Sequence, residues 1–500
     1  MKATFDTQPK LGYSKPSTLL PLLFAIFSVI AWVTWTTYWD AGLYGDNVEQ
    51  FVWVHSLEWG YFKHPPMPTW LLGVSIKLIG SHSWLTNALA AICFAVTGGL
   101  TWLIARRLFN ENVANAAIVL WTLQQCFSVS AQIYNHNTVL VMFMAATVYT
   151  SLRAQSETKS MAWWFSTGVL SGCAMLSKYQ AALPLLVLVV TLYAANKRSI
   201  RSLLSGFAMA VAGFIVVFSP HFYWAFVNKF PTLRYASAAI EAGDLMRRLS
   251  WVATFLVNQI RMLFPLLLAL TLSFVIYKFR RPKVGPAAME SHQPEQASIW
   301  LWGLVSAPVL ILLVASLMSG SQLRNHWGVQ LFQFLSVLIA WRFRQLPALS
   351  LTFLIPAAIA IHGVGFVYYG FKQSAPNAVQ SDRRADSAYP ARAMAEAALT
   401  HWGLQTACPL KIVGGDFEAG LVSAYLKEFP SVYSGGVATP WVTPEQIRQQ
   451  GILYVTDMNT NPPVEATAAT RWYLSGETAS TGKYVQIAVR LPEKSCNALS

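Results

Sequence analysis

The residues best suited to chemistry gather in one segment near the N-terminus, residues 39–82. Four carboxylates fall within 19 positions there, although the first 371 residues contain only 11 acidic residues altogether. These four are Asp40, Asp46, Glu49 and Glu58. Asp46 follows a glycine and is predicted to cap a helix N-terminus, which places Glu49 and Trp53 on the same side of that helix. Two carboxylates beside an aromatic surface suit general-base work on a substrate hydroxyl.

Cations predicted on the same face of the membrane complement these acids. Lys178 stands alone in LSKYQAAL between two apolar stretches, and Lys63 and His64 follow the acidic helix. Further cations on that face are Arg234, Arg247, Arg248 and Arg324. Each one alone fits a side chain that snorkels to the interface, and the aromatic residues fit an interfacial belt. Taken together, the cations suit a phosphate group.

The elements that position these residues are predicted to be membrane helices. With 54% apolar and 12% charged residues in 500, the chain is too hydrophobic for a soluble enzyme of this size. Several apolar stretches reach the roughly 18 residues needed to cross the bilayer as a helix. The first, residues 17–38, is too long for a signal-peptide core and lacks a cleavage site, so a retained helix is expected. Residues 67–80 are shorter and amphipathic, and we expect them to lie along the interface.

The distribution of charge sets the topology. From residue 372 onward Lys+Arg and Asp+Glu balance at 11 each, so the net charge of +14 lies entirely upstream, at the membrane. This placement argues against a nucleic-acid partner. The basic clusters between apolar stretches, such as Arg106/Arg107 and Arg280/Arg281, mark the cytoplasmic face by the positive-inside rule. Eleven spans follow, with a cytoplasmic N-terminus and an external tail: 17–38, 83–105, 113–131, 138–152, 161–177, 180–195, 203–224, 252–277, 298–318, 326–341 and 349–370.

The chain is therefore predicted to have two domains, a mostly α-helical polytopic membrane domain over 1–371 and a small extracytoplasmic α/β domain over 372–500. LKIVGGD, GILYVTD and KYVQIAVRLP are predicted as tail strands, alternating with helices in an arrangement that favours parallel pairing. The Gly-Gly after the first strand is read as a structural turn rather than a phosphate cradle. Cys408 and Cys496 flank this domain and are a candidate disulfide, while Cys93, Cys126 and Cys173 fall in predicted spans.

Three motifs resemble the family-39-like, GT-C fold bacterial glycosyltransferases, which include lipid A/core galacturonosyltransferases, the aminoarabinose transferase of lipid A and, more distantly, protein O-mannosyltransferases. The motifs are GDNVEQFVW followed by LEWGYFKHPPMPTWL, then MLSKYQAAL, and then FSPHFYWAFVNKFPTLRYA. The resemblance covers approximately residues 17–270. It implies a GT-C bundle in the bacterial inner membrane, a polyprenyl-phosphate sugar donor, and transfer on the periplasmic face.

The chain departs from the family pattern at two places. The family usually has Asp-Glu at the start of the loop helix, whereas here Asp46 precedes Asn47, so Glu49 is a candidate for the second carboxylate. Many relatives carry an acidic residue in the second outer turn, where this chain has Asn135, His136 and Asn137. These three are candidates to position an acceptor or to help bind a divalent metal ion, with no metal assigned.

A polyprenyl phosphate needs little protonation to leave, so transfer requires one base and cations for the phosphate. Asp46 is the predicted base, Glu49 its partner, and Lys178, His64 and Lys63 the predicted phosphate ligands. One displacement would invert the anomeric carbon, and the acceptor is lipid A/core, an envelope glycan or a protein. The alternatives are a transporter or flippase of a lipid-linked sugar, for which mid-membrane charges and repeated halves would be typical, and a non-catalytic envelope assembly protein.

Overall fold

Helices make up most of the chain, and a small mixed sheet follows them. The structure is a computed structural model that describes residues 16–156, 161–195, 200–238, 243–280, 295–320, 322–374, 386–457, 468–473, 484–493 and 496. The α-helices are α1 (Pro16–Trp39), α2 (Gly45–Trp53), α3 (Met67–Ile79), α4 (Leu85–Leu108), α5 (Glu111–Thr122), α6 (His136–Ser156), α7 (Met161–Ser177), α8 (Ala182–Ala194), α9 (Ile200–Val227), α10 (Pro231–Ala238), α11 (Leu245–Arg280), α12 (Glu295–Leu301), α13 (Ala307–Ser319), α14 (Gly328–Leu331), α15 (Leu335–Arg342), α16 (Leu351–Gln373), α18 (Ala391–Gln405), α19 (Phe417–Tyr425) and α20 (Pro444–Gln450). Short helical turns are η1 (Gln125–Phe127), η2 (Tyr179–Ala181), η3 (Trp302–Ser306), η4 (Asn325–Trp327), η5 (Pro347–Leu349) and η6 (Asp386–Ala388).

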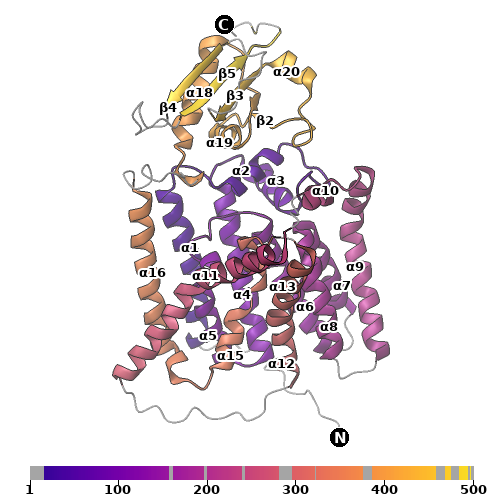
Figure 1. Cartoon of the computed structure of the whole chain (residues 1–500), viewed down its shortest axis with the longest axis vertical. Coiled ribbons are helices and arrows are strands. Elements are labelled where there is room, and N and C mark those ends of the chain that lie inside the picture. The colour runs from indigo at the N-terminus through magenta and orange to yellow at the C-terminus, as the bar shows by residue number, and fades with distance from the viewer. Residues whose placement is uncertain are drawn as a thin grey trace.

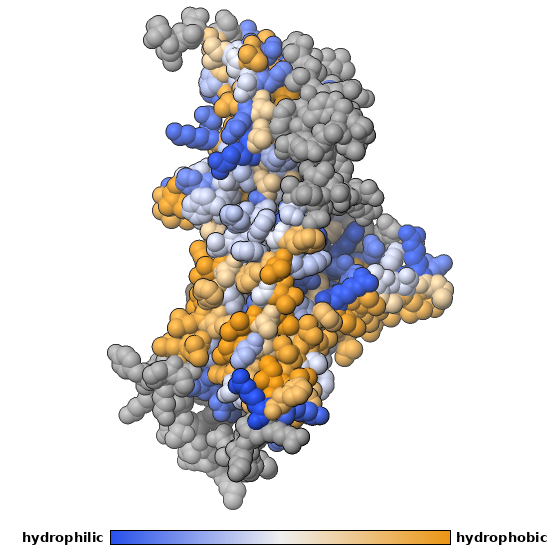
Figure 2. Space-filling view, turned by 90° about the vertical axis from the view of Figure 1, so that its left-hand side faces the viewer, coloured by the Kyte–Doolittle hydropathy of each residue, from blue (hydrophilic) through white to orange (hydrophobic). Residues whose placement is uncertain are grey.

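Within these ranges six helices are long and apolar enough to cross a membrane. They are Leu19–Trp39, Leu85–Leu108, Ile200–Val227, Leu245–Arg280, Ser298–Ser319 and Leu351–Gln373. Large apolar side chains remain exposed on their outer surfaces, including Val216 of α9 (64% exposed) and Val367 of α16 (73%). Figure 2 shows such side chains covering the middle of the bundle. The chain is a multi-pass membrane protein, since only lipid makes so much exposed apolar surface favourable.

The six helices coincide with six of the eleven predicted spans, and the other five fall on helices that are shorter or more polar. The predicted span 113–131 contains the 12-residue α5 and then η1, and the span 326–341 is divided between η4, α14 and α15. The 17-residue α7 and the 13-residue α8 are also short. The total number of crossings therefore stays a prediction.

The tail forms a five-stranded sheet that lies beyond one end of the bundle (Figure 1). Its strands are β1 (Ile412–Gly414), β2 (Ser431–Tyr433), β3 (Ile452–Asp457), β4 (Ala468–Tyr473) and β5 (Tyr484–Arg490), in the order β2-β1-β3-β5-β4. β2, β1 and β3 pair in parallel, as the alternation of strands and helices predicts. β5 pairs antiparallel with both β3 and β4, which was not predicted. The connection from β4 to β5 is shorter than the dozen or so residues of a parallel crossover, which accounts for the antiparallel pairing of these two neighbouring strands.

The Gly-Gly turn after β1 is structural. The Gly415 N–H donates to the carbonyl of Tyr433 on β2, and the backbone has a positive φ of 130°. A Cβ at this position would lie 2.3 Å from the carbonyl oxygen of Val455. Only glycine permits so close a backbone approach, and the adjoining backbone fills the turn.

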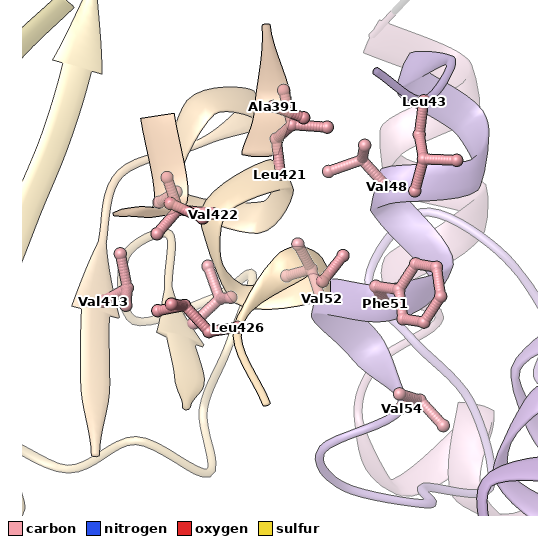
Figure 3. Packing of buried hydrophobic residues seen from close by; sticks show 14 of the residues in the cluster. Leu43, Val48, Phe51, Val52, Val54, Ala391, Val413, Leu421, Val422 and Leu426 are labelled. Atoms are coloured by element: carbon pink, nitrogen blue, oxygen red, sulfur yellow. The ribbon is translucent and has the colours of Figure 1, made fainter. Parts of the chain in front are cut away.

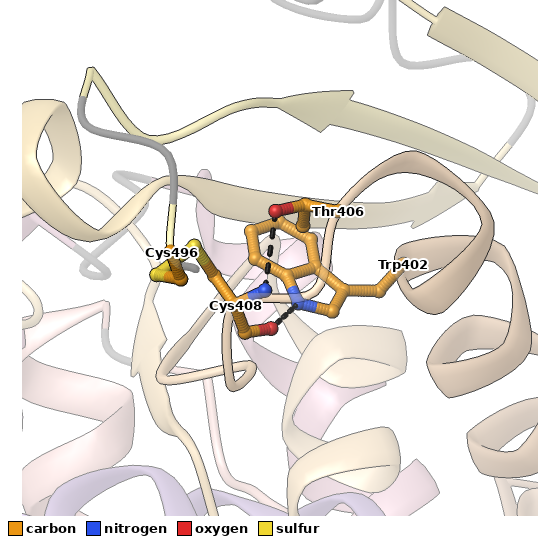
Figure 4. Close-up of a disulfide and its surroundings, with 4 residues drawn as sticks. All are labelled: Trp402, Thr406, Cys408 and Cys496. Carbon is orange, nitrogen blue, oxygen red and sulfur yellow. Dashed lines mark hydrogen bonds between the residues drawn. A yellow bond between two sulfur atoms is a disulfide. The ribbon is translucent and has the colours of Figure 1, made fainter. Parts of the chain in front are cut away.

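A disulfide joins Cys408 to Cys496, the pair that the sequence suggested (Figure 4). It ties the segment after β5 to the connection between α18 and β1. The indole N–H of Trp402 on α18 donates to the carbonyl of Cys408, so the crosslink is anchored to a buried helix residue. Closing a loop of 88 residues removes much of the conformational entropy of the unfolded tail, about 4 kcal/mol in the chain-entropy model.

The helix α2 joins the two parts of the molecule. It lies between the bundle and the tail (Figure 1), and one of its faces belongs to a hydrophobic core shared with the tail. Val48 and Val52 of α2 pack toward Leu421 and Val422 of α19 in Figure 3. The tail is thus packed directly against the loop helix that carries Asp46 and Glu49.

Candidate active site

Asp46 is exposed near the start of α2, and it does not cap the helix as predicted. The cap position is Tyr44, whose side chain makes no capping hydrogen bond. The free N–H of Gly45 instead donates to Oδ2 of Asp386, at 3.0 Å, a residue that follows α16. A carboxylate 341 positions away along the chain thus satisfies the helix N-terminus, and the carboxylate of Asp46 is left for other partners.

Asn135, in the turn before α6, orients the carboxylate of Asp46. Its Oδ1 accepts the backbone N–H groups of Asn137 and Thr138 and so caps α6. Its Nδ2 donates to Oδ2 of Asp46 at 2.7 Å. The amide is fixed on one side by the helix cap, so it holds one oxygen of Asp46 in place. The residue is exposed, so its carboxylate can still accept a substrate proton.

Glu49, one turn further along α2, forms an ion pair with Lys63. Nζ of Lys63 lies 2.5 Å from Oε2 of Glu49, and the two side chains are 26% and 22% exposed. Burial raises the pKa of Glu49, against the attraction of Lys63. Burial also works to lower the pKa of Lys63, but the charge and hydrogen bond of Glu49 outweigh it, and the Lys63 pKa is raised. Lys63 therefore stays charged, although much of that charge is already matched by Glu49.

The imidazoles of His64 and His136 lie next to each other with ring centroids 4.0 Å apart. Trp53 of α2 packs against both rings, at 6.3 Å from His64 and 5.8 Å from His136. Burial, followed by the nearby positive charges, lowers the pKa of each histidine well below its usual value. Both rings are therefore neutral at physiological pH.

Lys178 follows α7 and reaches the same group of residues. Its Nζ donates to Oδ1 of Asn137 at 2.9 Å. Burial lowers the pKa of Lys178 to about 8, with Asp46 raising it and Lys63 lowering it. A partly desolvated ammonium with one neutral acceptor is well suited to an anionic ligand, which would supply the missing countercharge.

All eight residues predicted for the site come from four separate segments and meet at the end of the bundle that faces the tail. The segments are α2, the loop before α3, the start of α6 with the turn before it, and the α7–η2 junction. Two further residues were missed. His326 in η4 is close enough for Asp46, Lys178 and Arg324 to influence its pKa, which burial lowers. The polar RNHW sequence signalled this turn, but the predicted span began at residue 326.

Asn47 was the second missed residue, and it fixes α2 rather than contributing a second carboxylate. It is fully buried, and its Nδ2 lies within hydrogen-bond distance of Thr86, Asn87 and the Gln132 carbonyl. Its Oδ1 accepts the N–H of Tyr134 at 2.9 Å. An amide suits this place because it both donates and accepts, which an ionised carboxylate cannot do.

Two of the arginines predicted on this face, Arg248 and Arg324, make different contacts. The guanidinium of Arg248 binds the carbonyls of Gly243, Leu317 and Met318, so it caps the end of α13 rather than facing a ligand. Arg324 is exposed and lines a mostly polar pocket between α11 and the turn before α14. The residues around that pocket are Trp251, Thr254, Phe255, Asn258, Gln322, Leu323, Arg324 and Asn325.

Comparison with known sequences points to one group of proteins. Residues 63–224 match the family described as dolichyl-phosphate-mannose-protein mannosyltransferase. The lipid A galacturonosyltransferase RgtD of Rhizobium johnstonii is 22% identical over 302 residues, which is 59% of this chain and 59% of that protein. The alignment therefore spans less than two thirds of this curated relative.

The fold matches solved structures over nearly the whole chain. ArnT from Cupriavidus metallidurans bound to undecaprenyl phosphate superposes with a TM-score of 0.63 at 15% identity, over 97% of this chain and 100% of that one. The apo state of the same protein gives a TM-score of 0.53 at 17% identity, over 95% and 98%. At this identity the likeness shows a shared fold. Together with the family match and the relative, it shows that the chain is similar to membrane glycosyltransferases in both sequence and fold.

Proposed function

We propose that the protein is an integral-membrane glycosyltransferase that moves a sugar from a polyprenyl phosphate to an acceptor in the cell envelope. The observation that carries the proposal is the exposed carboxylate of Asp46, held by Asn135 beside the half-buried ammonium of Lys178. A base and a phosphate-binding cation are thus adjacent, as the reaction requires. The undecaprenyl phosphate bound to ArnT, which shares the fold, supports this class of donor.

In the proposed reaction Asp46 accepts the proton of the acceptor hydroxyl as its oxygen attacks the anomeric carbon. The new glycosidic C–O bond forms while the bond from that carbon to the phosphate oxygen breaks. The polyprenyl phosphate leaves with the electron pair, and Lys178 neutralises its charge. A single displacement of this kind inverts the anomeric carbon.

The remaining residues have supporting roles in this mechanism. His64 is neutral, so it offers a hydrogen bond to the phosphate rather than a charge. Lys63 adds positive charge, which Glu49 holds in place through their ion pair. Asn137 holds Lys178 toward the cluster, and Asn135 orients the base. His136 has no step in the transfer itself.

We also propose that the site and the tail face the periplasm, across the inner membrane of a bacterium. The helices α4 and α6 both start beside the site, where Asn87 and His136 lie, and both end in cations, at Arg106/Arg107 and Arg153. These basic ends mark the cytoplasmic side by the positive-inside rule. The ionisable cluster sits at one end of the bundle, which supports an enzyme over a transporter with charges at mid-membrane.

A transfer assay with mass spectrometry tests the proposal. The purified protein is incubated with candidate polyprenyl-phosphate sugars and with lipid A, core glycan or envelope protein as acceptor. We expect one donor and acceptor pair to yield a product heavier by one sugar, with free polyprenyl phosphate released in equal amount. Transport of an intact lipid-linked sugar without cleavage of its phosphate bond would contradict the proposal.

A further inference from the structure

Three side chains that can bind a metal ion meet beside Asp46. Glu49 comes from α2, His64 from the loop before α3, and His136 from the first residue of α6. Each offers one ligand atom, and these atoms lie within 4.8 Å of one another. Among the described residues this is the one group of three or more His, Cys, Asp or Glu side chains with such spacing. The transfer mechanism above leaves one of them, His136, unused.

His136 is held in the form that binds metals. Its ring hydrogen-bonds to the backbone carbonyl of Pro65, so that ring nitrogen carries the proton. The other nitrogen, Nε2, has no hydrogen-bond partner, although the residue is only 3% exposed. An unpaired buried acceptor is costly, and one in a residue that lies beside a second imidazole and a carboxylate points to a missing ligand. A carbonyl that fixes the tautomer of a ligating histidine is a recurrent feature of metal sites.

The donor set selects the kind of metal. Two imidazoles and one carboxylate suit a divalent transition ion such as Zn²⁺ better than Mg²⁺ or Ca²⁺, which prefer oxygen ligands. Three protein ligands leave a fourth position open, the arrangement found in metal sites that bind a further group.

The charges around the site limit its affinity but do not exclude a cation. Lys63 bonds Oε2 of Glu49, and the carboxylate has a second oxygen. Lys63, Lys178 and Arg324 repel a cation, while Glu49 and Asp46 attract it. Removing Lys63 would therefore both free Glu49 and reduce the repulsion, and it should strengthen binding.

We infer that Glu49, His64 and His136 form a binding site for one divalent transition-metal ion of the Zn²⁺ type, beside Asp46 and Lys178.

Metal analysis on the purified full-length protein tests this site without any sugar donor. The protein is stripped with chelator in detergent, equilibrated with Zn²⁺ alone and measured by equilibrium dialysis with elemental analysis. We expect one bound equivalent, and at least about a tenfold loss of affinity in His64→Ala and in His136→Gln. His64 is only half-buried, so His64→Ala keeps the test valid if the His136 variant misfolds. Exposed His82 provides the matched control, and His82→Ala should bind Zn²⁺ as the unmodified protein does.

Two further measurements separate this site from adventitious binding. Co²⁺ substitution should give an absorption spectrum of nitrogen and oxygen coordination that His64→Ala abolishes. Lys63→Met should bind Zn²⁺ more tightly than the unmodified protein. Equal binding by the unmodified protein and His64→Ala, or no Zn²⁺ bound at all, would overturn the inference. The readout is metal binding, so failure here leaves the transfer assay unaffected, and the reverse also holds.

Discussion

The helix α2 presents two faces that do different work. One face carries Asp46 and Glu49, three residues apart, and it is turned to Asn135 and Lys63. The other carries Val48 and Val52, four residues apart, which are 1% and 7% exposed against the tail. Both spacings follow the helical repeat, so a helix of nine residues carries reactive groups on one face and apolar side chains on the other. We call the packing of Val48 and Val52 against the tail the apolar joint.

The comparison indicates how a short helix can hold reactive groups in place. Isolated helices of this length are unstable in water, so α2 depends on its tertiary contacts. The tail supplies several of them: Asp386 caps the helix N-terminus, and Gly420 of α19 lets the helices approach closely. The bundle supplies the buried bonds of Asn47. We therefore expect changes on the reactive face to alter catalysis, and changes on the other contacts to alter stability.

Apart from the loss of Asp46 itself, Lys178→Met should have the largest effect, and it acts on the reactive side of the site. Loss of the cation that stabilises the departing phosphate should lower kcat/KM for the donor by about 10²–10³-fold. The half-buried ammonium already pays a desolvation cost, so its removal should leave the thermal midpoint unchanged or raised. Kinetics and thermal unfolding on the same preparation check this. A large fall in the midpoint would show that Lys178 is structural.

Asn47→Ala should break the attachment of α2 to the bundle. It removes the buried hydrogen bonds to Asn87, Gln132 and Tyr134 and leaves their groups without partners. The expected cost is about 1–3 kcal/mol for each group left unsatisfied. The unfolding midpoint should fall, and activity should be lost in proportion to unfolded protein. Retained stability would mean that water replaces the amide.

Gly420→Ala should strain the apolar joint between α2 and the tail. The new Cβ would lie 2.5 Å from Val48 Cγ1 and 2.7 Å from Val52 Cγ2, so the two helices must move apart. Overpacking of this kind costs about 1–3 kcal/mol.

Gly403→Ala is the matched control for this change. Gly403 lies in α18 with no atom near the new Cβ, so alanine there should stabilise by up to about 1 kcal/mol. Opposite shifts in the unfolding midpoint are thus expected for one substitution at two helical glycines. Equal shifts would show that the joint is loosely packed.

A smaller effect on the reactive side is expected from pH, which should change kcat/KM for the donor through the protonation of Lys178. The pKa of Lys178 is lowered to about 8, so its ammonium is lost as pH rises through that value. The kcat/KM for the donor should then fall roughly tenfold per pH unit above the pKa. Lys178→Arg keeps its charge at these pH values and should lose this alkaline decline, although the geometry differs. A decline that persists in the arginine variant would assign the titration to another group.

Much of the site could be predicted because its residues are chemically unusual for a membrane chain. Asp46, Glu49 and Lys178 stand out in apolar surroundings, and the positive-inside rule put them on one face. The cap of α2 could not be predicted, because its partner Asp386 is remote in sequence. Within the local sequence Asp46 is the residue suited to a helix cap, so the sequence predicts that role for it.

The remaining differences have similar causes. The buried role of Asn47 depends on three segments that meet only in the fold. His326 was missed because hydropathy is averaged over many residues, and the short polar turn that contains His326 is followed directly by apolar residues. The predicted span therefore included it. The antiparallel half of the sheet was missed because β4 has a weak strand pattern, so the strand that pairs with β5 was not recognised in the sequence.

The reactive role of Asp46 is tested most directly by Asp46→Asn, with turnover and thermal unfolding measured on the same purified sample. The amide cannot accept the acceptor proton, so turnover should fall by about 10²–10⁴-fold. The residue is exposed on α2, and the amide keeps an oxygen that can accept the Asn135 hydrogen bond, so the unfolding midpoint should stay unchanged. Near-normal turnover in a folded Asp46→Asn protein would contradict the account.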